Sequence, residues 1–136
     1  MPKWSIVAIA SSNLFHLDTA NVNYYGISIT ISSNSNTLSG NTTNYNNVGF
    51  ILSSSSSNTL SGNKANYNVE NGFSLNTFSK SNTLTGNTAS TNGFYGYRDD
   101  STGSGTLGTA NSYSSDTCSG NGFGGSSPSG LGAPQP

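Results

Sequence analysis

The sequence predicts an all-β fold, a right-handed parallel β-helix of about five coils of 21–29 residues. The first observation is a repeated phrase, Asn-Thr-Leu-Ser-Gly-Asn, which occurs at residues 36–41 and 58–63 with a close copy at 82–87. The second is its spacing: the copies begin 22 and 24 residues apart, a period typical of solenoids, in which each repeat rests on the next. The third is a short-range alternation of apolar and polar residues, which indicates strands. Parallel strands joined by crossovers are right-handed in nearly all proteins, which sets the predicted hand.

Each coil is expected to contain three short strands. Residues 27–31, Ile-Ser-Ile-Thr-Ile, alternate strictly and predict the first of them. The second strand surrounds a recurring leucine and the third a recurring small residue, at Ala20, Thr43, Ala65, Ala89 and Cys118. Equivalent positions then stack roughly 4.8 Å apart. Because the single cysteine falls in the column of small residues, we interpret it as a buried small hydrophobe rather than a nucleophile or metal ligand.

This stacking predicts columns of like side chains. An inward aromatic column is expected just after the turn glycines, and it contains Phe50, Phe73, Phe94 and Phe123, with Ile27 before them. A leucine column contains Leu38, Leu60 and Leu84, capped by Phe15 and Tyr113. A turn column contains Asn41, Asn63 and Asn87, with Asp18 and Asp116 at its two ends. The amides of the turn column are expected to bond to one another and to the turn backbone.

The solenoid is predicted to span residues 1–125, followed by a flexible Gly/Ser/Pro-rich tail at 126–136. The start of the chain contains a short apolar run that Ser5 interrupts. Its residues 4–6 lie 23 positions before 27–29, so a core strand is favoured over a signal peptide.

The composition restricts the classes of partner. Only 7% of the residues are charged and the net charge is −1, so the chain lacks the basic surface that nucleic acid or an anionic membrane would require. No apolar stretch is long enough to span a bilayer as a helix. One cysteine excludes an intramolecular disulfide.

The repeated phrase, followed by Thr-Ala-Ser at 88–90 and by Asn-Gly-Phe at 92–94, resembles a known group of repeats. It is similar to the parallel β-helix repeats of the pectin-lyase-like superfamily, and most of all to the NosD-like and the carbohydrate-binding and sugar-hydrolase types. The resemblance covers about residues 4–125. It implies the fold, but not one function, because the same coil serves lyases, hydrolases, epimerases, adhesins and spacers.

The chemistry of that superfamily does not carry over to this chain. Its acids are scattered between coils, at Asp18, Glu70, Asp99, Asp100 and Asp116. Only Asp99 and Asp100 are close in sequence, and adjacent residues of a strand point to opposite faces. The name NosD implies copper, yet the soft ligands are limited to Met1, His16 and Cys118, whereas a copper site needs two or more that converge. We therefore predict no catalytic residues, no metal site and no cofactor.

Two stretches are candidates for ligand binding. The segment Tyr95, Tyr97, Arg98, Asp99 and Asp100 breaks the repeat and combines aromatic rings with charge, so it is interpreted either as a glycan contact or as a solvated loop in which Arg98 pairs with an aspartate. Tyr45 and Tyr67, with Val22 before them, form either an exposed aromatic platform or the cover of a core corner.

A regular array of hydroxyl groups is predicted on one outer face. Its pairs are Thr37 with Ser39, Thr59 with Ser61, Thr83 with Thr85, and Ser112 with Ser114. Such an array orders water, which raises an ice-binding hypothesis, although solubility is the simpler explanation.

Taken together, the residues predict a non-catalytic β-helix module of an extracellular or cell-surface protein, acting as a spacer, a self-association element or a weak glycan binder. The alternative is a fragment or relative of a polysaccharide-active lyase or hydrolase. End-to-end self-association through the first coil is expected because the strand edges and the rims of Trp4, Ile6 and Phe15 lie there.

Overall fold

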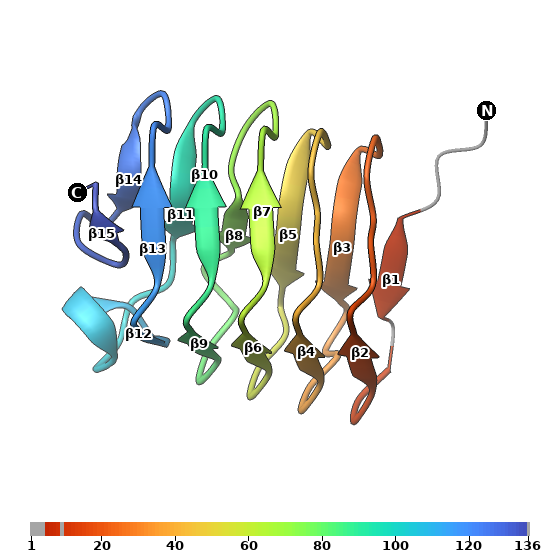
Figure 1. Cartoon of the computed structure of the whole chain (residues 1–136). Helices are drawn as coiled ribbons and strands as arrows, with labels where there is room; N and C mark the ends of the chain where they lie inside the picture. Colours follow the sequence, from red (N-terminus) through yellow and green to blue (C-terminus); the bar gives the residue numbers. More distant parts are fainter. Residues whose placement is uncertain (1–4, 9, 136) are drawn as a thin grey trace.

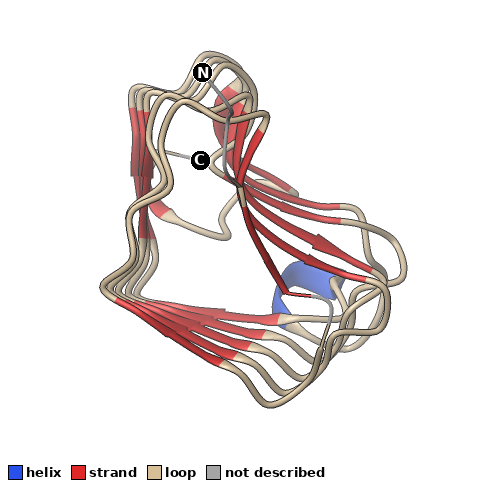
Figure 2. Ribbon diagram, turned by 90° about the vertical axis from the view of Figure 1, so that its right-hand side faces the viewer, coloured by secondary structure: helices blue, strands red, loops and turns tan. Residues whose placement is uncertain are grey.

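The structure, a computed structural model, describes residues 5–8 and 10–135 and is built from short parallel strands. Within these residues the strands form three stacked sheets that wind around a common interior (Figures 1 and 2). Sheet 1 contains, in spatial order, β1 (Ile6–Ala8), β3 (Tyr25–Thr30), β5 (Val48–Ser53), β8 (Phe73–Leu75), β11 (Tyr95–Asp99) and β14 (Gly124–Ser127). Sheet 2 contains β2 (Leu14–His16), β4 (Thr37–Ser39), β6 (Thr59–Ser61), β9 (Thr83–Thr85) and β12 (Ser112–Ser114). Sheet 3 contains β7 (Lys64–Asn66), β10 (Thr88–Ser90), β13 (Thr117–Ser119) and β15 (Ala133–Pro134).

This arrangement confirms the predicted parallel β-helix. Strands that are neighbours in a sheet belong to successive coils, as in the parallel pair β3 and β5, where Ile27 lies opposite Phe50. Ile6 pairs with Ile27 in the same register, while Trp4 lies outside the described residues. The leucine column runs from Phe15 through Leu38, Leu60 and Leu84 to Tyr113, and its three leucines are fully buried.

The inward aromatic column differs from the prediction in its last members. Phe50 stacks on Phe73 at 4.7 Å between ring centroids, and Phe73 stacks on Tyr97 at 5.0 Å. Tyr97 therefore occupies the position assigned to Phe94. Phe94 and Phe123 instead stack on each other at 4.6 Å outside the core, where Phe123 is 64% exposed.

A glycine column explains this shift. The backbones of successive coils approach closely at Gly26, Gly49, Gly72 and Gly96, where a Cβ on Gly72 would lie 2.7 Å from the carbonyl oxygen of Gly96. Each of these glycines directly precedes the inward residue, so the glycine equivalent to Gly72 is Gly96 and not Gly93. The letters Asn-Gly-Phe at 92–94 repeat those at 71–73 but lie in a different part of the coil.

Three columns of polar residues run along the interior of the corners, and all of their members except the half-buried Asn13 and Asp18 are buried. They are Asn13, Asn36, Asn58, Asn82 and Asn111; Asp18, Asn41, Asn63, Asn87 and Asp116; and Asn23, Asn46, Asn68, Asn92 and Asn121. Asn63 shows the pattern: its Oδ1 accepts from N and Nδ2 of Asn41, and its Nδ2 donates to the carbonyl of Leu38 and to Oδ1 of Asn87. Among the described residues no buried side-chain nitrogen or oxygen lacks a partner.

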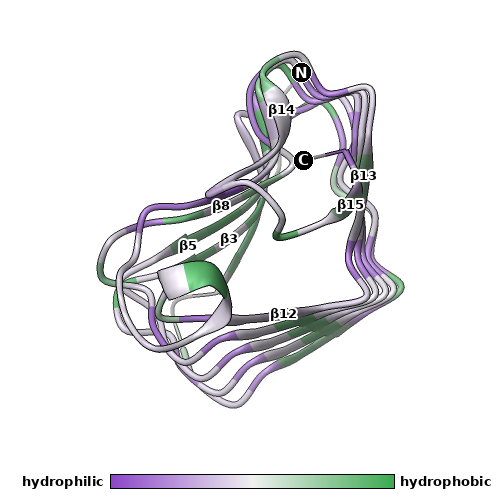
Figure 3. Ribbon diagram, turned by 90° about the vertical axis from the view of Figure 1, so that its left-hand side faces the viewer, coloured by the Kyte–Doolittle hydropathy of each residue, from purple (hydrophilic) through white to green (hydrophobic). Residues whose placement is uncertain are grey.

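The C-terminal segment does not form the expected flexible tail. β14 pairs with β11, and β15 pairs with β13 at the end of the solenoid (Figure 3). Leu131 is 3% exposed and belongs to the core cluster. A Cβ on Gly132 would lie 2.9 Å from Tyr97, so this segment covers the otherwise open last coil. Glycine-rich composition here permits close packing rather than disorder.

Candidate functional site

The predicted ligand-binding segment Tyr95–Asp100 does not form a surface loop. It is strand β11 up to Asp99, so its side chains alternate between the core and the solvent. Tyr97 is fully buried and its hydroxyl donates to the carbonyl of Thr117 at 3.2 Å, while burial raises the pKa of its phenol well above the usual range. Arg98 points outward and its Nε donates to Oδ1 of Asp100 at 3.0 Å. The true insertion follows the strand and contains the short 3₁₀ turn Thr106–Gly108.

Asp99 lies in a buried polar cluster at the C-terminal end. Its Oδ2 accepts from the hydroxyl of Tyr113 and from Nδ2 of Asn111, both at 2.9 Å, and its Oδ1 accepts from Ser101. Asp116 accepts from N and Nδ2 of Asn87 at 2.8 Å, and burial raises the pKa of its carboxyl. Both aspartates are at most 5% exposed. Since hydrogen bonds within the protein saturate these carboxylates away from solvent, the cluster fits structural support rather than a reaction with a substrate.

The soft ligands of the described chain lie far apart. Nδ1 of the exposed His16 on β2 is 2.7 Å from Oγ of Ser39, and the buried Cys118 on β13 contacts the carbonyl of Gln135 at 2.8 Å. β2 belongs to the first coil and β13 to a coil four strand spacings away, which is about 19 Å. No group of three His, Cys, Asp or Glu residues able to hold a metal occurs in the described residues. These residues do not fit a copper centre, and Met1 lies outside the described residues.

Exposed aromatic side chains instead gather where sheet 3 turns into sheet 1. Val22, Tyr45 and Tyr67 occupy equivalent positions directly before the buried asparagines, with φ of 61°, 59° and 57°. The rings of Tyr45 and Tyr67 are 5.3 Å apart with an interplanar angle of 10°, and the residues are 59% and 51% exposed. A spacing of this size corresponds to an offset stack. The sequence left two interpretations of Tyr45 and Tyr67 open, an exposed aromatic platform and the cover of a core corner. In the structure the two rings form the exposed platform.

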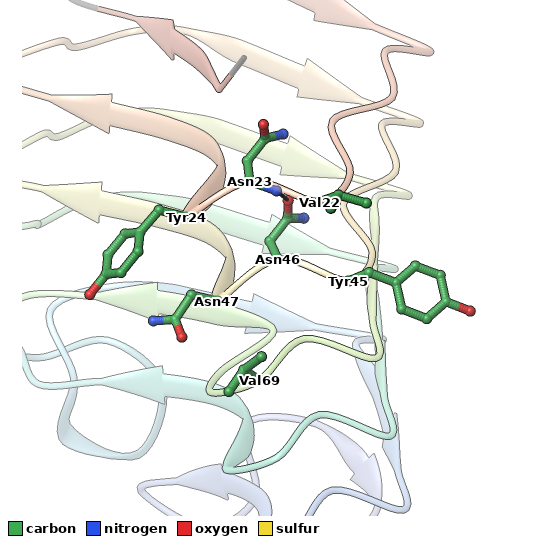
Figure 4. A pocket seen from close by; sticks show the side chains of 7 residues that line it. All are labelled: Val22, Asn23, Tyr24, Tyr45, Asn46, Asn47 and Val69. Carbon is green, nitrogen blue, oxygen red and sulfur yellow. Dashed lines mark hydrogen bonds between the residues drawn. The ribbon is translucent and has the colours of Figure 1, made fainter. Parts of the chain in front are cut away.

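A depression of about 450 Å³ adjoins this platform. Its lining consists of Val22, Asn23, Tyr24, Tyr45, Asn46, Asn47 and Val69 (Figure 4). Tyr24 and Tyr45 extend from opposite sides of it, and Tyr24 is 62% exposed. Nδ2 of Asn47 donates to Oε1 of Glu70 at 3.0 Å. We call Val22, Tyr24, Tyr45, Tyr67 and Val69 the aromatic corner.

Sequence reasoning found part of this corner and missed the rest. Tyr45, Tyr67 and Val22 are recognisable in the sequence because they lie about one coil apart. Tyr24 and Asn47 were missed, although both directly follow a buried asparagine, Asn23 and Asn46, and so must turn outward. That position after each column asparagine is the signal that could have identified them.

The predicted hydroxyl array lies on the outer face of sheet 2. Thr37, Thr59, Thr83 and Ser112 are aligned in register and exposed. Thr85 and Ser114 lie within 3.1 Å of each other through their hydroxyl oxygens. Because hydroxyls on neighbouring strands hydrogen-bond to each other, part of the hydrogen-bonding capacity of this face is satisfied within the protein.

The architecture defines a solenoid protein of the parallel β-helix class. A family model described as "Periplasmic copper-binding protein (NosD)" matches residues 5–127, and the chain belongs to this family. Neither the curated proteins nor the solved structures contain a match. No helix in the described residues is long and apolar enough to cross a membrane.

Proposed function

We propose that this protein is a non-catalytic β-helix module of the cell envelope that binds glycans at the aromatic corner. The observation that carries the proposal is the exposed offset pair Tyr45 and Tyr67 beside a depression lined by amides. Exposed apolar surface is unfavourable in water, so a cluster of exposed aromatic side chains favours a site that binds a partner or ligand.

The chemistry of the corner suits a sugar. A pyranose has an apolar face of C–H groups that stacks on a tyrosine ring, and a rim of hydroxyls that need donors and acceptors. Tyr24 and Tyr45 each supply a ring at the depression, and the two rings point away from each other on either side of Asn46 (Figure 4). The amide of Asn47 has two N–H donors and a carbonyl acceptor, of which Glu70 uses one donor, so capacity remains for ligand hydroxyls.

A catalytic role and a copper role have less support. A glycosidase needs two carboxyl groups that face one cleft. Here Asp99 and Asp116 are buried, and Asp100 pairs with Arg98. The family description names the periplasm and copper, and we adopt the location outside the cytoplasm but not the metal, because His16 and Cys118 are about 19 Å apart along the solenoid. A copper titration at neutral pH is expected to show no stoichiometric binding.

Glycan-array binding of the purified chain, followed by calorimetry, tests the proposal. The double variant Tyr45→Ala/Tyr67→Ala should lose binding while its unfolding transition stays unchanged, because both rings are exposed. Phe78→Ala is the matched control, since Phe78 is an aromatic residue of 68% exposure on the loop after β8. Equal binding by the double variant and the control, or no binding of any glycan by the unaltered chain, would reject the corner as a glycan site.

A further inference from the structure

A single carboxylate borders the aromatic corner. Glu70 directly follows Val69, which lines the depression, and Nδ2 of Asn47 donates to Oε1 of Glu70 at 3.0 Å. The Oε2 atom of Glu70 accepts no hydrogen bond from any described residue. Within the described part of the chain the one ion pair joins Arg98 to Asp100, so Glu70 has no cationic partner there. Glu70 is therefore a half-buried charge without a counter-charge, next to the proposed binding site.

The backbone places this carboxylate in a line of residues along the edge where sheet 3 turns into sheet 1. The N–H of Val48 donates to the carbonyl of Tyr24, and that of Glu70 donates to the carbonyl of Asn47. The N–H of Phe94 donates in turn to the carbonyl of Glu70. Four successive coils therefore contribute Tyr24, Asn47, Glu70 and Phe94 to this line, with neighbouring members one strand spacing of roughly 4.8 Å apart. The amide and the carboxylate lie between two aromatic residues.

The aromatic rings on both sides of Glu70 along this line suit a cation. Tyr24 meets Tyr25 edge-on, with the ring centroids 4.7 Å apart and an interplanar angle of 81°. On the other side the half-buried Phe94 stacks on Phe123 at 4.6 Å. Burial raises the pKa of the Tyr25 phenol, and the neighbouring Tyr24 and the charge of Glu70 raise it further. Because the face of an aromatic ring is also electronegative, these rings and the carboxylate together favour a positively charged group.

Resting on the glycan-binding function proposed above, we infer that the ligand is an amino sugar chain whose protonated amine binds the carboxylate of Glu70. The ammonium group donates a charge-assisted hydrogen bond to Glu70, while the amide of Asn47 holds the carboxylate through Oε1. The sugar ring that carries the amine lies in the depression, which Asn47, Val69 and Tyr45 line together. A hydroxyl in place of the amine lacks the charge, and an acetylated amine lacks the charge and keeps only one N–H donor. An acidic sugar is repelled by Glu70.

The experiment compares three β-1,4-linked tetrasaccharides that differ only in the group on carbon 2. Tetraglucosamine carries an ammonium group there, chitotetraose an acetylated amine and cellotetraose a hydroxyl, and calorimetry at about pH 6 keeps the free amines protonated. Tetraglucosamine should bind at least about fivefold more tightly than the other two. Glu70→Gln should lower its affinity about five- to tenfold and leave cellotetraose unaffected, because glutamine keeps an acceptor for Asn47 but carries no charge.

Asp18→Asn is the matched control, because it also removes one negative charge but lies in the turn column, where Asn41 is the next member. It should leave all three affinities unchanged, and thermal unfolding verifies that both variants fold.

The outcomes separate this inference from the proposed function. If Tyr45→Ala/Tyr67→Ala abolishes glycan binding while Glu70→Gln binds tetraglucosamine as tightly as the unaltered chain, the glycan site stands and the amino-sugar assignment is wrong. Loss of tetraglucosamine in Glu70→Gln alone supports the ammonium subsite and rejects the tyrosine pair as the glycan site. Chitotetraose or cellotetraose bound as tightly as tetraglucosamine would overturn the ligand class. Tetralysine offers ammonium groups without a sugar ring; if it binds equally well and Glu70→Gln weakens it equally, the ligand is a basic peptide and the inference fails.

Discussion

Replacement of Asn63 by alanine tests whether the buried amides hold the coils together. Asn63 is fully buried, and four hydrogen bonds of 2.9–3.0 Å join its side chain to Asn41, Leu38 and Asn87. The alanine variant leaves two donors of Asn41 without their acceptor and removes one donor each from the carbonyl of Leu38 and from the Oδ1 of Asn87, which still accepts from the backbone N–H of residue 63. A buried unsatisfied group costs about 1–3 kcal/mol, so the two donors of Asn41 alone should lower the free energy of unfolding by about 2–6 kcal/mol, with any admitted water recovering part of it.

The assay is equilibrium urea unfolding followed by far-UV circular dichroism and tyrosine fluorescence. Asn66→Ala is the matched control, because Asn66 lies in the same coil, is half-buried, and accepts from the N–H of Ser90 at 2.9 Å. It should cost less than about 1 kcal/mol, the usual net value of one hydrogen bond. Equal losses in the two variants would refute the reasoning that the buried column carries the stability.

Asn63→Asp separates the contribution of the hydrogen bonds that the Asn63 side chain donates from that of the bonds it accepts. The carboxylate keeps the bonds from Asn41 but places an anion against the carbonyl of Leu38 and the Oδ1 of Asn87. Because burial favours the neutral acid, the pKa of this carboxyl should rise on folding, and the variant should regain stability as the pH falls. A pH-independent loss relative to the unaltered chain would contradict this assignment.

Three other predictions concern the packing of the leucine column, the pKa of Asp116 and the association of the first coil. Leu60→Ala should lower the free energy of unfolding by about 2–5 kcal/mol, because Leu60 is fully buried between Leu38 and Leu84; a neutral effect on urea unfolding would contradict the column. Burial raises the pKa of Asp116 above its ordinary value of 3.8, so its stabilising contribution is complete below 3.8 and is lost as the pH rises through the folded-state pKa. The stability of the unaltered chain relative to Asp116→Asn should therefore increase from pH 7 towards pH 4, and parallel pH profiles in urea unfolding would exclude this effect. Ile6→Lys should suppress end-to-end association at high micromolar concentration, measured by sedimentation, whereas a strict monomer before the change would reject self-association.

The repeat made most of the solenoid predictable. Leu38 and Leu60 occupy identical phrases, so their stacking followed from the period alone, and the column Asn41, Asn63 and Asn87 followed in the same way. The prediction was wrong where the same short sequence occurs at two positions that are not equivalent in the coil. Asn71 precedes Phe73 as Asn92 precedes Phe94, but the buried asparagine equivalent to Asn92 is Asn68.

The candidate site was harder to predict because burial depends on register. The aromatic and charged residues of 95–100 looked like an exposed loop, yet a three-residue shift of the glycine column places Tyr97 in the core and Phe123 outside. Likewise, composition alone suggested a flexible tail. A Cβ on Gly125 would lie 2.5 Å from Sγ of Cys118, so glycine is required there by close packing against the last coil.

The direction of the amide columns distinguishes the two ends of the solenoid. Between members of a column, each asparagine donates to the side-chain oxygen of the next coil toward the C-terminal end. The last amides therefore need acceptors, and Asp99, Asp116 and Gln135 supply them to Asn111, Asn87 and Asn121, respectively. At the other end, the side-chain oxygens of Asn13, Asp18 and Asn23 accept no hydrogen bond from any described residue. Two first coils brought face to face would therefore place acceptors opposite acceptors. Any end-to-end association of two copies must then rest on the strand edge of β1 and the half-buried Ile6 and Phe15, while a coil that offers N–H donors would match the same end better.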